Sequence, residues 1–256
     1  CTLYIDLSGE SLFKRGWRTD KGEAPLKENM AAGLLKLSGW TPDMPLLDPF
    51  CGSGTIAIEA ASIACGLVPG ISRSFGFEKL LNFDRELWTE LREDAKSEVN
   101  LHREVSITAS DISSIVVRKA EANALRAGLG GLLESGNLKF SVCDARNVLP
   151  PTETPGIIVA NPPYGEQSTP RSATVGSMMR HVADNLKHNF AGWTAWMLTS
   201  DRHLPGEMHL KEGRKTVLFN GPLECRFFKF DLVAGSNRRV KNRDAASDST
   251  PSDAES

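Results

Sequence analysis

The residue types best suited to chemistry stand at positions 161–164, where the sequence reads Asn-Pro-Pro-Tyr. They directly follow a short apolar run that is typical of a buried strand. Because each proline lacks an N–H group, Pro162 and Pro163 cannot continue a strand and leave a stiff loop at its end. An amide oxygen accepts hydrogen bonds from an amino group, and a tyrosine ring stacks on a flat partner. Asn161 and Tyr164 therefore predict a loop that holds a planar molecule by its amino group.

A glycine-rich stretch with an acid at its start occupies residues 48–55, Asp-Pro-Phe-Cys-Gly-Ser-Gly-Thr. It joins a predicted strand at 45–48 to a predicted helix at 55–65. Gly52 and Gly54 permit positive φ angles and close approach of the backbone, and the start of the helix offers free N–H groups. The stretch lacks the Gly-Lys-Ser/Thr of a phosphate-binding loop, and its acid would repel a phosphate and favour a cationic ligand. A plain tight turn is the alternative interpretation.

Acidic residues also follow two further predicted strands. Asp111 follows the strand at 105–109, and Asp144 follows the strand at 138–142. An acid at the carboxyl end of a parallel strand can bind a ribose diol, and Asp144 could meet an adenine amino group. Each acid alone could be a helix cap or a turn residue. Three strand ends that each have an acid favour one shared ligand site.

The elements that must position these residues alternate along the chain. The sequence predicts strands at 3–7, 45–48, 105–109, 138–142, 157–160, 194–199, 216–219 and 225–230, and helices at 27–37, 55–65, 113–127 and 175–190. Repeated strand–helix units predict an α/β fold with a mainly parallel sheet, helices on both faces and ligands beyond the carboxyl ends of the strands. The last two strands, joined by Gly221-Pro222, can pair antiparallel. Residues 66–104 interrupt this rhythm with a loop and an amphipathic helix.

Length and composition narrow the class of protein. The 256 residues, 40% of them hydrophobic, suit one α/β domain, and no apolar run has the length of a membrane span or the features of a signal peptide. Five scattered cysteines without a C-x-x-C pair indicate reduced thiols in a cytoplasmic protein, with neither a disulfide framework nor a zinc site. The five histidines show no metal-ligand spacing. A net charge of −2 argues against a strongly electrostatic nucleic-acid binder.

Two segments have an unusual charge pattern. Basic residues gather near the start of the chain, diluted by acids, and form either a solvated surface or a phosphate-contact patch: Lys14, Arg15, Arg18, Lys21 and Lys27. Residues 236–256 have almost no apolar side chains and cannot bury enough surface to offset the entropy lost on ordering. We expect this tail to be disordered.

Taken together, the motifs resemble those of the class I S-adenosylmethionine (SAM) methyltransferases. Residues 48–54 are similar to the glycine-rich motif of these enzymes, and residues 161–164 to the catalytic motif of the group that methylates amines. More narrowly, four segments are similar to the RlmL-type guanine-N2 methyltransferases of large-subunit (23S) ribosomal RNA: 6–12, 14–18, 24–29 and 220–226. The likeness extends over about residues 1–235.

The resemblance implies a Rossmann-like sheet of seven strands, mostly parallel with an antiparallel late strand, and SAM as methyl donor without a metal. It implies cofactor binding by Asp48, Pro49, Phe50, Gly52, Gly54, Thr55, Asp111, Ile112, Asp144, Ala145 and Asn161, and catalysis by Asn161, Pro162, Pro163 and Tyr164. Asp48 and the glycine loop would surround the methionine part of SAM. Asp111 would hold the ribose hydroxyls, and Asp144 the adenine amine.

The same resemblance divides the chain into a leading strand-and-helix segment (1–40), a methyltransferase domain (41–235, with an insertion at 66–104) and the tail. The family typically has an RNA-binding THUMP domain ahead of its catalytic domain. Because the chain starts with Cys1 rather than Met and has no room for such a domain, we expect a fragment of a longer protein. We expect it to be monomeric and to act on ribosomal RNA.

The expected chemistry is methylation of an exocyclic amine. The side-chain oxygen of Asn161 and a backbone carbonyl of Pro162-Pro163 would accept both N–H bonds and direct the nitrogen lone pair at the methyl group, while Tyr164 stacks on an unpaired or flipped-out base. Two alternatives remain open. The same loop could methylate adenine-N6 in DNA or a protein glutamine amide, or the chain could be a SAM-binding or RNA-binding module without catalysis.

Overall fold

The computed structural model describes residues 1–19, 26–163 and 172–234. The described helices are α1 (Glu28–Ser38), α2 (Thr55–Ala64), the 3-10 helix η1 (Gly76–Lys79), α3 (Arg85–Ser97), α4 (Ser114–Arg126), α5 (Gly130–Glu134), α6 (Ser172–Asn189) and α7 (Leu204–Glu207). The described strands are β1 (Leu46–Asp48), β2 (Ile107–Asp111), β3 (Leu138–Val142), β4 (Ile157–Ala160), β5 (Thr194–Thr199), β6 (Arg214–Asn220) and β7 (Leu223–Asp231).

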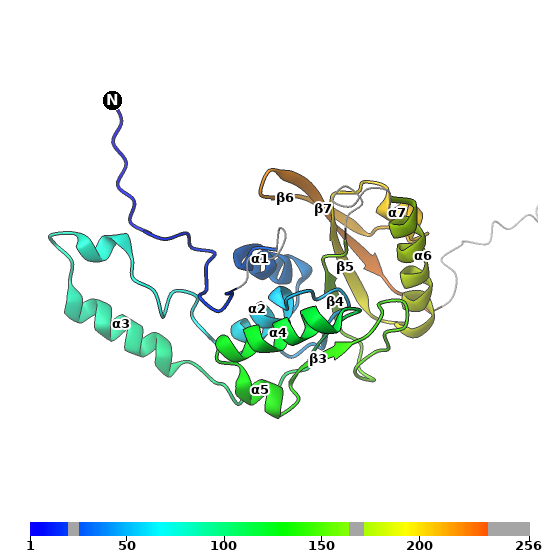
Figure 1. Cartoon of the computed structure of the whole chain (residues 1–256), viewed down its shortest axis with the longest axis horizontal. Coiled ribbons are helices and arrows are strands. Elements are labelled where there is room, and N and C mark those ends of the chain that lie inside the picture. The colour runs from blue at the N-terminus through cyan, green and yellow to red at the C-terminus, as the bar shows by residue number, and fades with distance from the viewer. Residues whose placement is uncertain (20–25, 164–171, 235–256) are drawn as a thin grey trace, which may run out of the picture.

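The seven described strands form one sheet in the order β3-β2-β1-β4-β5-β7-β6 (Figure 1). The pairs from β3 to β5 are parallel, and β7 is antiparallel to both β5 and β6. This confirms the predicted fold class, including the single antiparallel late strand. The direction of the sheet places the carboxyl ends of β1, β2, β3 and β4 along one edge, where ligands bind in folds of this kind.

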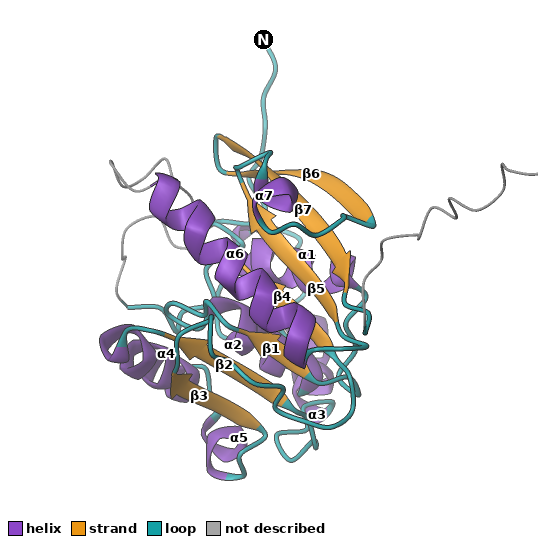
Figure 2. Cartoon of the chain, turned by 90° about the vertical axis from the view of Figure 1, so that its right-hand side faces the viewer, coloured by secondary structure: helices purple, strands orange, loops and turns teal. Residues whose placement is uncertain are grey.

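Helices cover both faces of the sheet (Figure 2). Successive residues of the central strands point to opposite faces, so that Leu46 packs in the core beneath α1 and α2, whereas Leu47 packs in the core beneath α6. Both side chains are fully buried. Burial on both faces explains why β1 and β4 are continuous apolar runs, without the polar alternation of a half-exposed sheet.

The predicted insertion at 66–104 forms a lobe beside the sheet, to which η1 and α3 belong (Figure 1). No residue of α3 is buried. Phe75, Phe77, Phe83 and Trp88 pack ring against ring within the lobe, with centroid separations of 5.0 to 6.0 Å. The lobe therefore has a small aromatic core of its own.

The prediction of a strand at residues 3–7 is wrong. This segment is irregular, and Leu3 and Tyr4 are about nine-tenths exposed. The carbonyl of Leu7 accepts a hydrogen bond from the Phe77 N–H at 3.1 Å, so the end of the segment lies against the insertion. Its apolar and aromatic residues suit a strand, but a strand requires a partner edge, and the described edges of the sheet are β3 and β6.

Smaller differences concern element ends. Strand β2 begins at Ile107, two residues later than predicted, and the short helices η1, α5 and α7 are absent from the predicted pattern. The described part of the chain contains no helix with the length and hydropathy of a membrane span. The expected disordered tail, residues 236–256, lies outside the described residues.

Candidate cofactor and catalytic site

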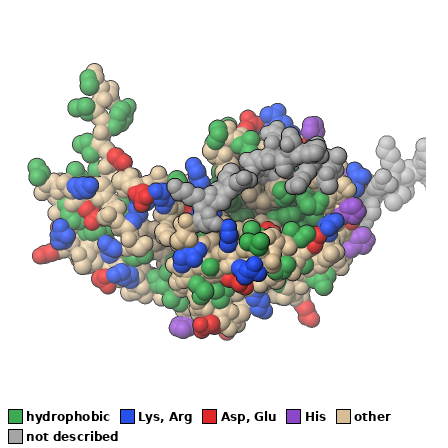
Figure 3. Space-filling view, viewed as in Figure 1, with side chains coloured by type: hydrophobic (Ala, Val, Ile, Leu, Met, Phe, Trp, Pro, Cys, Tyr) green, Lys and Arg blue, Asp and Glu red, His purple; other side chains and the backbone are tan. Residues whose placement is uncertain are grey.

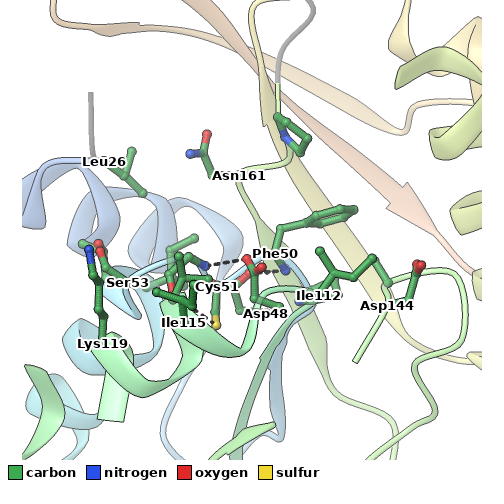
Figure 4. Close-up of a pocket in the computed structure, with 18 of the residues that line it drawn as sticks. Leu26, Asp48, Phe50, Cys51, Ser53, Ile112, Ile115, Lys119, Asp144 and Asn161 are labelled. Carbon is green, nitrogen blue, oxygen red and sulfur yellow. Dashed lines mark hydrogen bonds between the residues drawn. The ribbon is translucent and has the colours of Figure 1, made fainter. Parts of the chain in front are cut away.

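A cavity of about 1200 Å³ opens at the carboxyl ends of the parallel strands (Figure 4). Most of the predicted site residues line it: Asp48, Pro49, Phe50, Gly52, Thr55, Asp111, Ile112, Asp144, Ala145, Asn161 and Pro163. Four strands and the loops that follow them contribute these residues. The structure therefore brings together the three strand-end acids and the start of the Asn-Pro-Pro-Tyr loop.

Two of the predicted residues that the structure describes, Pro162 and Gly54, do not line this cavity. Pro162 is buried. Gly54 lies behind the loop, where a Cβ would come within 2.9 Å of the Ala120 Cβ and 3.2 Å of the Phe140 ring. Its φ of +87° also requires glycine, so Gly54 shapes the turn into α2 and does not face the cavity. Tyr164 lies outside the described residues.

Asp48, the last residue of β1, is the most buried acid of the cavity, with only 1% of its surface exposed. Burial and the nearby charge of Asp111 raise the pKa of Asp48 to about 8, although the Phe50 N–H donates to its Oδ1 at 3.1 Å. The same burial and both carboxylates raise the pKa of the Cys51 thiol. This end of the cavity is therefore poor in positive charge and favours a cationic ligand.

Asp111, the last residue of β2, ties two backbone segments together. Its Oδ2 accepts a hydrogen bond from the Gly52 N–H at 3.1 Å, and its Oδ1 accepts one from the Ser113 N–H at 2.9 Å. These bonds fix the carboxylate against the glycine loop. Each oxygen still has a lone pair for another donor, such as a hydroxyl group.

Asp144 follows β3 and has a different environment. Its carboxylate forms an ion pair with Arg146, whose Nη2 lies 2.5 Å from Oδ2 and whose Nε lies 3.0 Å from both oxygens. The hydrogen bond from Arg146 lowers the pKa of Asp144. The Arg146 side chain is about half exposed, with a relative accessibility of 47%. The pair sits at the open end of the cavity, apart from Asp48 (Figure 4).

Ile112 and Ile115 form an apolar surface in the same cavity. Both side chains are more than half exposed, at 67% and 60%, and both line the cavity. Large aliphatic side chains left uncovered beside carboxylates suit a ligand with a flat apolar ring and polar edges.

The glycine loop and the helix that follows it are also held by two arginines, and Arg18 is one of the residues that line the cavity. Arg18 donates to Ser53 Oγ at 2.9 Å and Thr55 Oγ1 at 2.7 Å, while its Nε pairs with Glu28 at 3.0 Å. Arg15 forms a two-pronged pair with the buried Glu59, at 3.1 Å to each oxygen. Both arginines are largely buried and paired with carboxylates, so the interpretation of these two as RNA-contact residues is not supported. Their role in the structure is to clamp α1 and α2 together.

The chain matches the family model for an RMKL-like methyltransferase domain over residues 15–229. The chain belongs to this family. The match covers the clamp arginines, the whole sheet up to β7 and every described residue of the cavity.

Curated relatives of this RMKL-like domain agree with the family model. The chain is 43% identical over 246 residues to the ribosomal RNA large subunit methyltransferase K/L of Shewanella baltica strain OS155, and 43% identical to that of Shewanella loihica. The alignment with the former covers 93% of this chain and 33% of the relative. The chain thus spans about one third of the length of the curated relatives that it matches.

Solved structures show the same fold. SMU.472, a protein proposed to be a methyltransferase and solved in complex with SAH, superposes with a TM-score of 0.80 at 33% identity, covering 91% of this chain and 58% of that one. A predicted N6-adenine-specific DNA methylase from Listeria monocytogenes superposes with a TM-score of 0.78 at 34% identity, covering 88% of this chain and 56% of that one.

Sequence reasoning missed several residues of the RMKL-like domain that face the cavity. Ser53 and Asn123 are linked, because the Asn123 side chain donates to the Ser53 carbonyl at 2.9 Å. Asn123 is only 4% exposed within α4, and a buried amide in an otherwise apolar helical pattern is a signal that could have identified it. Met178 and His181 of α6 also line the cavity, but nothing in their sequence context distinguishes them. Among the described residues, no group of three or more His, Cys, Asp or Glu side chains is placed to hold a metal ion.

Proposed function

We propose that this chain transfers a methyl group from SAM to the exocyclic N2 amine of a guanine in large-subunit (23S) ribosomal RNA. The observation that supports this most is that Asn161 and Pro163 open onto the same cavity as Asp48, Asp111 and Asp144. An amine-holding loop and a site suited to a cation with a flat ring therefore share one space.

The cavity fits SAM in its charge and its shape. A sulfonium beside Asp48 would favour the charged form of this carboxyl group, whose pKa burial raises, and the ribose hydroxyls suit the carboxylate of Asp111. The adenine ring suits Ile112 and Ile115, with its amino group toward Asp144. When bound, SAM would supply an electrophilic methyl group.

The protein's contribution to the reaction is positional. The Asn161 oxygen and a carbonyl of the Pro162-Pro163 segment accept the two amine protons, which aims the nitrogen lone pair and stabilises the charge that this nitrogen gains. The nitrogen–methyl bond forms as the methyl–sulfur bond breaks, and the electron pair of that bond remains on sulfur. The extra proton leaves the nitrogen afterwards to solvent, so no dedicated base is required. Tyr164 would stack on the base.

Ribosomal RNA is favoured as the substrate by the curated relatives, which are large-subunit ribosomal RNA methyltransferases. Because the chain spans one third of their length, further RNA affinity would come from other domains, such as an upstream THUMP-like domain. We propose that the chain acts as a monomer.

The test is transfer of tritiated methyl groups from SAM to ribosomal RNA, DNA and protein, followed by nucleoside analysis. The proposal predicts label in N2-methylguanosine. Asn161→Ala should retain SAM binding and lose at least tenfold in transfer, about 1.4 kcal/mol of transition-state stabilisation. The control is Asn137→Ala, which removes an amide directly before β3, at the amino ends of the parallel strands. This variant should transfer methyl groups normally. Near-normal turnover by Asn161→Ala would overturn the mechanism.

A second candidate is methylation of adenine-N6 in DNA. It is favoured by the structural likeness to the Listeria monocytogenes protein, a predicted N6-adenine-specific DNA methylase. An adenine amine presents the same planar NH2 to Asn161 as guanine does. Label in N6-methyladenine of DNA, with none in RNA, would replace the first proposal with this one.

A further inference from the structure

One face of α4 is basic where it lines the cavity. Arg118, Lys119 and Arg126 line it together with Ala122 and Asn123, at spacings that place all five on one side of a helix. The single acid of α4, Glu121, is not among the residues that line the cavity. Figure 3 shows Lys and Arg side chains gathered where Figure 1 places α4. We call Arg118, Lys119 and Arg126 the α4 basic face.

No carboxylate among the described residues neutralises the two arginines of this face. Arg118 is exposed and has no hydrogen bond or ion pair within the described part of the chain. Arg126 donates through Nε to the Trp17 carbonyl at 2.8 Å and through Nη2 to Asn123 Oδ1, and both of these acceptors are uncharged. These bonds hold the Arg126 guanidinium in place and leave its charge uncompensated.

This sets Arg118 and Arg126 apart from Arg15 and Arg18 near the start of the chain. Arg15 and Arg18 are paired with Glu59 and Glu28, respectively. Their charges are cancelled, and their donors are occupied by the protein. The positive potential available to a ligand at this side of the cavity therefore comes from α4.

The position of the face relates it to the reaction site. Asn123 lies among the basic residues and donates to the carbonyl of Ser53 in the glycine loop. In Figure 4, Lys119 and Ser53 lie at one side of the cavity and Asp144 at the other. At about 1200 Å³ the cavity exceeds the usual range of about 300–1000 Å³ for small-molecule sites, so it has room beyond one cofactor. The acids suit the cationic ligand, and the bases suit an anionic one.

We propose that the α4 basic face binds backbone phosphates of the RNA next to the base that enters the cavity. This inference rests on the proposed function, because it presumes an RNA substrate. Guanidinium groups form two parallel hydrogen bonds with a phosphate, so an exposed Arg118 and an oriented Arg126 are suitable partners. With a net charge of −2, the chain as a whole does not attract RNA, and contact must be local to such a face.

The test measures binding of a fluorescently labelled fragment of large-subunit ribosomal RNA to this chain over a series of salt concentrations. Arg118→Gln removes a charge without removing a hydrogen bond to any described residue, so its fold should be retained. Loss of one phosphate contact should weaken RNA binding about threefold to fivefold at low salt and reduce the slope of log affinity against log salt by ~0.7. Arg118→Lys should restore most of the RNA affinity and most of the salt dependence. The affinity of both variants for SAH should stay at the wild-type value.

The matched control is Arg214→Gln, which removes an exposed charge on β6, at the opposite edge of the sheet from β3. The inference is overturned if Arg118→Gln binds RNA with the affinity and the salt dependence of the wild-type protein. It is also overturned if Arg214→Gln loses as much RNA affinity as Arg118→Gln does. A fall in SAH affinity with unchanged RNA binding would also overturn it, because the anion would then be the carboxylate of the cofactor. Methyl transfer by the wild-type chain is measured in parallel, and its absence would contradict the proposed function alone.

Discussion

The two ends of the cavity both present an acid that follows a strand, yet the acids have opposite properties. Asp48, after β1, is almost fully buried, and its pKa is raised to about 8. Asp144, after β3, reaches the surface, and Arg146 lowers its pKa. Strand-end position alone therefore does not determine how a carboxyl group behaves.

The two ends of the cavity also differ in how firmly the rest of the protein holds them. At the β1 end, the glycine loop is fixed by Asp111, Arg18 and Asn123, which bond it from three elements. At the β3 end, Asp144 is held by Arg146, which is only two residues away and has a side chain that is about half exposed. Binding at the first end draws on a prearranged site, whereas binding at the second requires an exchange of partners for the carboxylate.

The largest expected effect tests how tightly the β1 end is packed. Gly54→Ala places a Cβ 2.9 Å from Ala120 at a φ of +87°, and should lower the free energy of unfolding by about 2–4 kcal/mol. Gly39→Ala is the control, because Gly39 has a φ of +76° but no atom within 4 Å of a Cβ. Gly39→Ala should lower the free energy of unfolding by about 1 kcal/mol. Urea unfolding measures the free energy of unfolding of both variants. Equal losses of this free energy would show that the contact with Ala120 is easily relieved.

The next effect tests the electrostatics of Asp48. Between pH 4 and pH 8 the folded protein binds one more proton at Asp48 than the unfolded chain does, since the folded pKa is raised to about 8 from the ordinary value of 3.8. The contribution of Asp48 to the free energy of unfolding is therefore fully present below pH 4 and is lost as the pH rises to 8. Asp48→Asn cannot titrate and keeps an acceptor for the Phe50 N–H.

Relative to wild type, Asp48→Asn should gain about 2 kcal/mol of unfolding free energy from pH 6 to pH 8. Urea unfolding at the two pH values measures this gain. The variant should also lose about tenfold in affinity for SAM, which is a sulfonium cation, and less for SAH, which is not. A pH-independent difference between variant and wild type would contradict the raised pKa.

The position of these acids was predictable from the sequence, but their surroundings were not. The order of short apolar runs and acids predicted that Asp48, Asp111 and Asp144 meet at one edge of a parallel sheet, because the connection rules for such sheets are strict. Gly54 was predicted to permit a close approach, but two of the three side chains that approach it belong to α4 and β3, far away in sequence. Sequence pattern identifies the residue and not its neighbour.

Properties that depend on tertiary partners could not be predicted. Arg18 and Arg118 are equivalent as residue types, but one is enclosed by Glu28, Ser53 and Thr55 and the other has no partner among the described residues. Residues 3–7 likewise have the side chains of a strand but pair with neither edge of the described sheet. In each case the outcome depends on which segments meet in space, and local periodicity contains no information about that.

The smallest expected effect concerns the β3 end, where Arg146→Ala removes the partner of Asp144. Because the Arg146 side chain is about half exposed, the loss of its pair with Asp144 should leave the free energy of unfolding nearly unchanged. The freed carboxylate should bind SAH at least as tightly as in the wild-type protein, since no partner then has to be displaced. Isothermal titration with SAH measures this, and Arg202→Ala, which breaks an exposed pair at the other side of the sheet, is the control. A tenfold loss of affinity in Arg146→Ala alone would mean that Arg146 itself contacts the ligand, and the two ends would then differ less in preorganisation than their burial indicates.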